Sequence, residues 1–144
     1  MLYRPILFLL LTFVAGVCRA DCFDDAGALH GVNPWILRAI AARESNGRAD
    51  AVHRNTNGTE DYGYTQTNSK HLPELASLGV SKSDLFDACK SVYVAGWLVQ
   101  KKIRRWGNTC YAIGAYHSET PAKRDAYIRQ LQQILYGWGV VWTC

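Results

Sequence analysis

The chain has 144 residues, of which 49% are hydrophobic and 19% are charged, and it carries a formal net charge of +4 at pH 7. This length and composition favour one domain with one hydrophobic core. The charge is too weak for a nucleic-acid-binding protein, although it suits an anionic polymer as partner. We therefore expect no nucleic-acid partner, and we find no internal repeat, low-complexity stretch or linker.

The first twenty residues have the pattern of a signal peptide. Arg4 precedes an apolar run over residues 6–17, which is too short for a comfortable membrane span. Small side chains in the run 18–20 predict cleavage after residue 20 and export to the periplasm. Two alternatives stay open, an uncleaved anchor and a lipoprotein acylated on Cys18. Cleavage leaves residues 21–144 as a single domain.

Two helices are predicted at the start of that domain, over residues 23–30 and from Pro34 onward. Asn33 is a favoured cap for the second helix, and proline is favoured at a first helical position. Apolar residues recur on one face of this helix, and Glu44 falls at the next helical step of that face. Glu44 should therefore point inward at the helix C-terminus. Burial and the negative end of the helix dipole both favour the protonated carboxyl that a general acid needs.

A small hairpin is predicted over residues 54–68, with its turn at residues 57–58, because glycine, asparagine and threonine punctuate this stretch. Asp61 lies in it, seventeen positions after Glu44. A protonated carboxyl with a second carboxylate nearby is the arrangement that cleaves glycosidic bonds. A structural reading of Asp61, as a turn residue that bonds its own backbone, is equally favoured. Gln66 and Asn68 should alternate along a strand and face the same side, as sugar ligands or as solvent-facing polar residues.

Helices are expected in the rest of the chain. They begin near residue 81, run through residues 92–104 and 110–117, and end with a helix that starts at Thr120 and Pro121. Asn108 or Thr109 should cap the helix over 110–117. The predicted fold class is therefore α+β, mostly helical, with a small sheet beside a groove. The four histidines show no metal-ligand spacing, so we expect neither a metal nor a cofactor.

Cleavage after residue 20 would leave an even number of cysteines, namely Cys22, Cys89, Cys110 and Cys144. An even count in an exported chain predicts two disulfides, for which three connectivities are possible.

Two families share the motifs around Glu44. The stretch from Glu44 to residue 69 resembles animal c-type lysozymes, which carry Glu-Ser-Asn, Asn-Thr-Asp-Gly and Asp-Tyr-Gly-Ile-Leu-Gln-Ile-Asn-Ser in this order. Residues 22–136 look more like the small lytic transglycosylases, with an SLT domain, that accompany bacterial secretion, conjugation and pilus machines. Those proteins share His-Leu-Pro-Glu-Leu, here residues 71–75, and carry Ala-Tyr-Asn-Ala-Gly, which here reads Ala-Tyr-His-Ser-Glu over 115–119.

The resemblance implies a lysozyme-like fold over residues 21–144 and a role for several side chains. Glu44 would be the catalytic acid, and the substrate-binding residues would be Ser45, Asp61, Gln66, Asn68 and Tyr116. In the bacterial family the tyrosine reaches the catalytic acid, and Ser45 would support that acid or the sugar N-acetyl group. The relatives also favour the pairings Cys22–Cys89 and Cys110–Cys144.

The chain departs from the bacterial pattern at two places. Thr65 and Thr67 replace apolar residues, and His117 with Ser118 replaces Asn-Ala. Trp97 and Trp106 could stack on sugar rings, although most tryptophans of a small domain belong to its core.

The resemblance implies cleavage of the β-1,4 bond between N-acetylmuramic acid and N-acetylglucosamine in peptidoglycan, by a monomer that opens the wall for such a machine. Peptidoglycan glycan strands would be the substrate, and components of the machine would be partners. Two alternatives stay open. One is a hydrolytic lysozyme that uses Glu44 with Asp61, and the other is a non-catalytic glycan-binding assembly protein. An unused buried carboxyl would cost stability, which argues against the binding protein.

Overall fold

The computed structural model describes residues 21–143, so the predicted signal peptide and Cys144 lie outside the described residues. In this part of the chain, six α-helices carry the fold: α1 (Cys22–His30), α2 (Pro34–Ser45), α3 (Leu72–Ser77), α4 (Ala88–Trp106), α5 (Cys110–Gly114) and α6 (Pro121–Gly137). Three strands and two 3-10 helices complete it: β1 (Val52–Arg54), β2 (Glu60–Tyr62), β3 (Thr67–Asn68), η1 (Ser69–His71) and η2 (Ser83–Phe86). The predicted α+β, mostly helical class is confirmed.

Helix α2 begins and ends where its flanking residues predict. The Asn33 side chain accepts a hydrogen bond from the backbone N–H of Trp35 at 2.9 Å, and Pro34 occupies the first turn. The helix ends at Ser45 because Asn46 adopts a left-handed conformation with φ of +53°, and its N–H bonds to the carbonyl of Ala42. Glu44 therefore sits in the last turn of a helix whose end is fixed.

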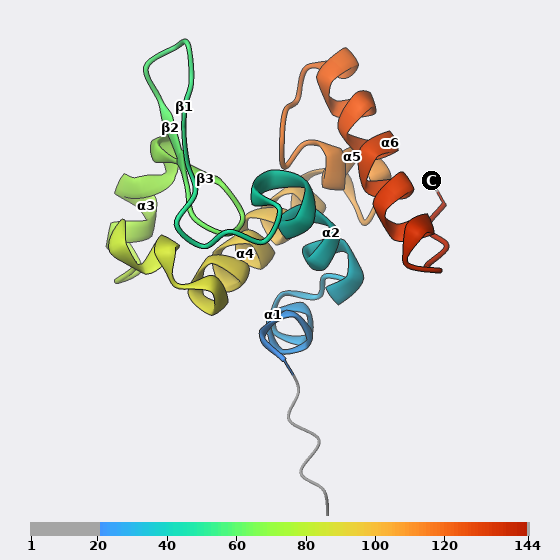
Figure 1. Cartoon of the computed structure of the whole chain (residues 1–144), viewed down its shortest axis with the longest axis horizontal. Helices are drawn as coiled ribbons and strands as arrows, with labels where there is room; N and C mark the ends of the chain where they lie inside the picture. Colours follow the sequence, from blue (N-terminus) through green and yellow to red (C-terminus); the bar gives the residue numbers. More distant parts are fainter. Residues whose placement is uncertain (1–20, 144) are drawn as a thin grey trace, which may run out of the picture.

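The hydrophobic core forms where α1, α2 and α6 meet the long helix α4 and its neighbours. Its largest fully buried side chains include Leu37, Ile40, Val99, Tyr127 and Leu131. Helix α4 runs between two parts of the molecule, with the sheet and α3 on one side and α5 and α6 on the other (Figure 1). This arrangement holds the end of α2 between the sheet and α6.

The strands form one antiparallel sheet in the order β1-β2-β3. In its register Asp61 lies opposite His53 on one side and opposite Asn68 on the other. The turn between β1 and β2 contains Gly58 with φ of +83°, as the predicted turn at residues 57–58 requires. Asp61 is thus on the central strand, with both neighbouring strands available to hold its carboxylate.

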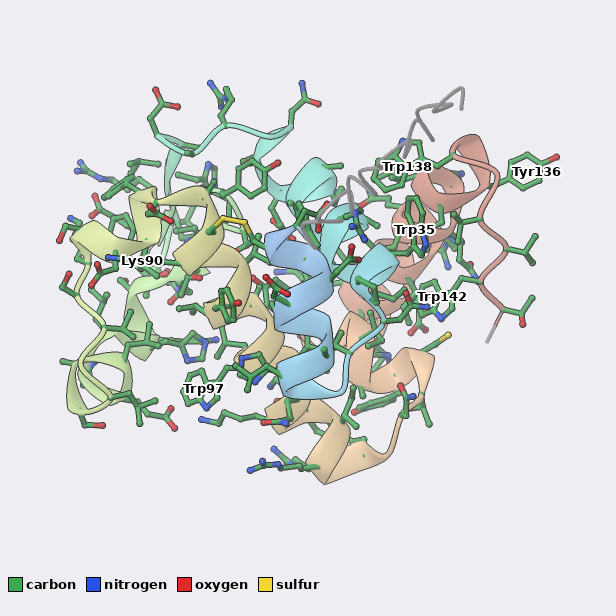
Figure 2. All side chains as sticks on the ribbon, turned by 90° about the horizontal axis from the view of Figure 1, so that it is seen from below. Trp35, Lys90, Trp97, Tyr136, Trp138 and Trp142 are labelled. Carbon is green, nitrogen blue, oxygen red and sulfur yellow. A yellow bond between two sulfur atoms is a disulfide. The ribbon has the colours of Figure 1, made fainter. Side chains whose placement is uncertain are left out.

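A disulfide joins Cys22 to Cys89 and so connects the first turn of α1 to the first turn of α4 (Figure 2). This pairing confirms one of the two predicted bridges. The other involves Cys144, which lies outside the described residues, and stays a prediction. Among the residues that are described, no helix is both long enough and apolar enough to cross a membrane.

The fold differs from the sequence predictions at two places near the groove. Gln66 is not on a strand: it has φ of +53°, and its N–H closes a turn to the carbonyl of Gly63 at 3.2 Å. The helix predicted over 110–117 ends at Gly114, because the N–H groups of Tyr116 and His117 bond three residues back instead of four. This tightening lets the chain leave the helix and turn toward α2.

Candidate active site

A polar groove with a volume of about 620 Å³ lies between the end of α2, the sheet and the turn after α5. It brings together most of the predicted site residues, which are Glu44, Asp61, Gln66, Asn68 and Tyr116. Besides the carboxyls of Glu44 and Asp61, the lining contains four cationic side chains, namely Arg43, Arg48, Lys70 and Lys123. The groove is therefore positively charged overall, which suits an anionic polymer.

A second, mainly apolar pocket of about 380 Å³ lies between α1, α3 and α4. Trp97 lines this pocket, where Lys101 lies over its ring, and not the polar groove. Trp106 packs against Tyr111 with ring centroids 5.1 Å apart and is also absent from the groove lining. Neither tryptophan is placed to stack on a sugar in the polar groove. The apolar pocket has no pair of carboxyls, so the polar groove is the candidate active site.

Glu44 projects from the last turn of α2 into the groove. Its Oε1 is buried and makes no hydrogen bond to any described residue, and its side chain is only 12% exposed. A buried carboxyl oxygen without a partner is costly as a charged group. Glu44 is therefore a largely buried carboxyl at the edge of a polar groove.

Tyr127 on α6 and His117 form a layer beside this carboxyl. Their rings stack with centroids 4.7 Å apart and an interplanar angle of 5°. His117 Nδ1 lies 3.7 Å from Glu44 Oε1. Burial raises the pKa of the Tyr127 hydroxyl well above its ordinary value, and the neighbouring Glu44 carboxyl raises it further. The sequence analysis did not identify Tyr127 as a site residue, because helical phase predicts burial and not the neighbours across helices.

Asp61 is held by two side-chain amides from neighbouring parts of the hairpin. Its Oδ2 accepts a hydrogen bond from Asn55 Nδ2 at 2.9 Å, and its Oδ1 accepts one from Asn68 Nδ2 at 2.6 Å. The carboxylate thus bonds side chains and does not turn back to its own backbone. Its orientation in the groove is fixed on both sides.

Gln66 and Asn68 both line the groove, but their amide donors hold the protein together. Gln66 Nε2 donates to the carbonyls of Ala51 and Gly63, at 3.1 and 2.8 Å. Asn68 Nδ2 donates to Thr59 as well as to Asp61, and Asn68 Oδ1 accepts from the N–H of Lys70. These hydrogen bonds therefore fix the shape of the sheet side of the groove.

Ser45 is buried and does not line the groove. Its hydroxyl donates to the carbonyl of Tyr64 at 2.7 Å, and it accepts from the N–H of Arg48 at 3.1 Å. Ser45 therefore ties the end of α2 to the loop before β3, directly beside Glu44 in the chain. Of the two roles that the resemblance implies for Ser45, this placement favours support of Glu44 over contact with a sugar.

Tyr116 reaches across the groove to the loop before β3. Its hydroxyl donates to the carbonyl of Thr65 at 2.8 Å. Burial raises the pKa of Tyr116 strongly, and the charge of the nearby Glu44 raises it further. Tyr116 is thus close to the acid, while its hydrogen bond goes to the backbone.

The two threonines that depart from the family pattern are fully buried. Thr65 Oγ1 donates to the carbonyl of Ser91 at 3.0 Å, and the N–H of Thr65 donates to Ser91 Oγ at 3.1 Å. Thr65 and Ser91 thus anchor the loop before β3 to α4, because their buried polar groups form hydrogen bonds with each other. The replacement of an apolar residue at 65 is therefore matched by a serine on the helix behind it.

Known proteins resemble this chain over most of its length. A family profile described as "Transglycosylase SLT domain" matches residues 21–132. The chain is 37% identical over 130 residues to Protein IpgF of Shigella flexneri, covering 89% of this chain and 86% of that protein. It is 33% identical over 140 residues to X polypeptide of Escherichia coli, covering 92% and 82%. It is 34% identical over 107 residues to Invasion protein IagB of Salmonella typhimurium, covering 74% and 67%.

Proposed function

The chain belongs to the transglycosylase SLT family and is an enzyme of the lytic transglycosylase class, and from this we propose that it cleaves the β-1,4 bond between N-acetylmuramic acid and N-acetylglucosamine. The observation that carries the proposal is Glu44. Among the described residues, its Oε1 is the only carboxyl oxygen that is buried without a hydrogen bond, and Glu44 lines a polar groove.

Glu44 acts first as an acid and then as a base. Its proton goes to the glycosidic oxygen, the bond from that oxygen to C1 breaks, and positive charge develops on the muramic ring. The Glu44 carboxylate then takes the proton of the muramic 6-hydroxyl, whose oxygen bonds to C1 and closes a 1,6-anhydro ring. Glu44 ends the cycle protonated, so one residue serves both steps.

Asp61 supports the positive charge from the sheet side of the groove. Asn55 and Asn68 hold its two oxygens, so the carboxylate is fixed before the substrate arrives. The 1,6-anhydro route does not need Asp61 as nucleophile, because the nucleophile belongs to the substrate. Its fixed carboxylate is also the observation that favours the second candidate, hydrolysis by water as in a lysozyme.

The biological role follows from the resemblance and from the relatives. Small lytic transglycosylases of this kind accompany secretion, conjugation and pilus machines, and one relative is named as an invasion protein. We propose that the enzyme is exported to the periplasm, acts as a monomer on peptidoglycan glycan strands and opens the wall locally for such an apparatus. The four cations in the groove lining support an anionic wall polymer as substrate.

Digestion of purified wall sacculi tests the proposed reaction. The wild type should clear sacculi and release muropeptides with 1,6-anhydro ends, which mass spectrometry finds one water lighter than reducing ends. Glu44→Gln removes the transferable proton at nearly constant shape, so activity should fall by about 10²–10⁴-fold or more.

Glu74→Gln is the matched control, because Glu74 lies on α3, outside the groove lining, and pairs with Lys101. It should keep the activity of the wild type. Substantial activity of a folded Glu44→Gln variant would eliminate Glu44 as the acid. If the products carry only reducing ends, the reaction is hydrolysis and not transglycosylation.

A further inference from the structure

We infer that His117 is a positioning residue for Glu44: its Nδ1–H donates a hydrogen bond to Glu44 Oε1 and so keeps the acidic proton on Oε2, the oxygen that then serves the glycosidic bond. This inference rests on the proposed function, because it gives a role to the neighbour of the proposed acid. It concerns a position where the chain departs from the family it resembles, since His117 stands in place of asparagine.

The distance and the burial of the two atoms support this bond. His117 Nδ1 lies 3.7 Å from Glu44 Oε1, which is buried and lacks a hydrogen bond within the described chain. A buried acceptor of this kind is expected to find a donor. Hydrogen bonds of catalytic groups are often long before substrate binds and shorten in the complex. A small movement of either side chain makes the bond.

The imidazole is held in one plane. It stacks on the Tyr127 ring at 4.7 Å and 5°, and the backbone N–H of His117 donates to the carbonyl of Gly114 at 3.2 Å. The ring therefore presents Nδ1 to the carboxyl from a fixed direction. The Tyr127 hydroxyl is also buried, and its interaction with Glu44 contributes to its raised pKa. It offers a second donor on the same buried side of Glu44.

A carboxylic acid carries its proton on one oxygen and accepts hydrogen bonds best on the other. Donation from His117 to Oε1 therefore leaves the proton on Oε2. Glu44 recovers its proton within each reaction cycle, so His117 does not need to supply one. The expected effect is on the orientation of the acid and thus on kcat, with little effect on substrate binding.

This arrangement predicts a signature at acid pH. Protonation of His117 would place a positive charge 3.7 Å from Glu44 Oε1, and a positive charge at that position favours the carboxylate over the active, protonated acid. Tyr127 stacks on the His117 ring. The other charged and titratable groups that line the groove with His117, besides Glu44 and two further histidines, are Arg43, Arg48, Asp61, Lys70, Tyr116 and Lys123. Arginine and lysine stay charged and tyrosine stays neutral between pH 5 and 7.

Two further histidines line the groove and need a control. Burial lowers the pKa of His71 to about 4, so His71 stays neutral above pH 5. His53 is exposed on β1, opposite Asp61. His53→Asn makes the same chemical change as His117→Asn on the other side of the groove. It should leave the acid limb of the pH profile unchanged.

The test compares His117→Asn and His117→Ala with the wild type, on soluble glycan strands, between pH 5 and 8. An asparagine amide can donate to Oε1 but carries no charge. We expect His117→Asn to keep kcat within about fivefold at neutral pH and to lose the acid limb. His117→Ala removes the donor, and kcat should fall by about 10–100-fold with KM changed less than about threefold, as for a hydrogen bond to an ionisable group.

Unchanged kcat in a folded His117→Ala variant, or a wild-type acid limb in His117→Asn, would overturn the inference. A second measurement needs neither a variant nor activity. Long-range ¹H–¹⁵N NMR of the wild type should show His117 with its proton on Nδ1 at neutral pH, and a proton only on Nε2 would also overturn it. Failure of the wild type to cleave sacculi would contradict the proposed function, whereas the NMR result would still decide the role of His117.

Discussion

At the scale of single residues, the two carboxyls of the groove have opposite environments. Glu44 Oε1 is buried without a hydrogen bond in the described chain, whereas both oxygens of Asp61 accept bonds from asparagine amides. A buried carboxyl without a hydrogen bond is unfavourable as an anion. A carboxylate held by hydrogen-bond donors is preorganised to stabilise positive charge. These environments support the proposed roles, which are proton transfer for Glu44 and charge stabilisation for Asp61.

Replacement of Asp61 separates its supporting role from that of a nucleophile. Asp61→Asn keeps the shape but cannot offer a negative charge to the developing cation. We expect kcat to fall by about 10–100-fold while the products keep their 1,6-anhydro ends, a loss of about 1.4–2.7 kcal/mol of transition-state stabilisation. Rate measurement with mass spectrometry of the products checks both parts. Complete loss of activity would instead favour a covalent or hydrolytic role for Asp61.

At the scale of elements, the loop between β2 and β3 shapes the groove through close contacts with its neighbours. The N–H of Gly63 donates to the carbonyl of Ala51 at 2.8 Å, and Gln66 closes the turn that follows. Tyr116 and Ser91 bond the loop at Thr65 from two other elements. The sheet side of the groove is therefore fixed by residues from α4 and from the turn after α5.

Gly63 is the position where this packing leaves no room. It has φ of +75°, and a Cβ there would lie 1.7 Å from the backbone oxygen of Leu85 on η2. We expect Gly63→Ala to lower the free energy of unfolding by about 3 kcal/mol or more, through overpacking and backbone strain together. Denaturant unfolding measures this change.

Gly58 provides the matched control for that prediction. It has φ of +83°, but a Cβ there would meet nothing within 4 Å. Gly58→Ala should therefore cost only the backbone strain of a left-handed alanine, about 1 kcal/mol. Equal losses in the two variants would show that the contact with Leu85 contributes nothing.

At the scale of the whole molecule, the groove lies between two parts that different helices hold in place. The sheet and α3 lie on one side of α4, and α5 and α6 lie on the other (Figure 1). Glu44 and Asp61 reach the same groove only if α2 and the sheet keep their positions against α4. The disulfide between Cys22 and Cys89 joins α1 covalently to the start of α4.

Loss of that disulfide should weaken the fold as a whole. The bridge connects residues 67 positions apart, so it removes much conformational freedom from the unfolded chain. The double variant Cys22→Ser with Cys89→Ser should lose about 2–4 kcal/mol of unfolding free energy. Its activity at low temperature should remain near that of the wild type, because neither cysteine lines the groove.

Unfolding of the oxidised, reduced and double-serine proteins checks this prediction. The reduced protein and the double variant should unfold at similar denaturant concentrations if the bridge alone is responsible. The intact mass of the exported protein should rise by four hydrogens on reduction if the second predicted bridge, to Cys144, also forms. A rise of two hydrogens would contradict that second bridge.

The sequence alone determined the features that depend on short spacings. Helical phase predicted the inward position of Glu44, Asn33 and Pro34 predicted the start of α2, and Asn57 with Gly58 predicted the turn of the hairpin. These features follow from local backbone geometry, which nearby residues decide. The motifs from Glu44 onward also identified the family.

Only the tertiary structure decided which side chains meet in the groove. Tyr127 and His117 come to Glu44 from segments far along the chain, and no spacing in the sequence indicates their contact. Gln66 lies in a turn and not in the predicted strand, and α5 ends at Gly114, before the predicted residue 117. In both places packing against other elements outweighs the local preference of the sequence. A site built from several elements depends on contacts across the core, and these form only when the whole chain has folded.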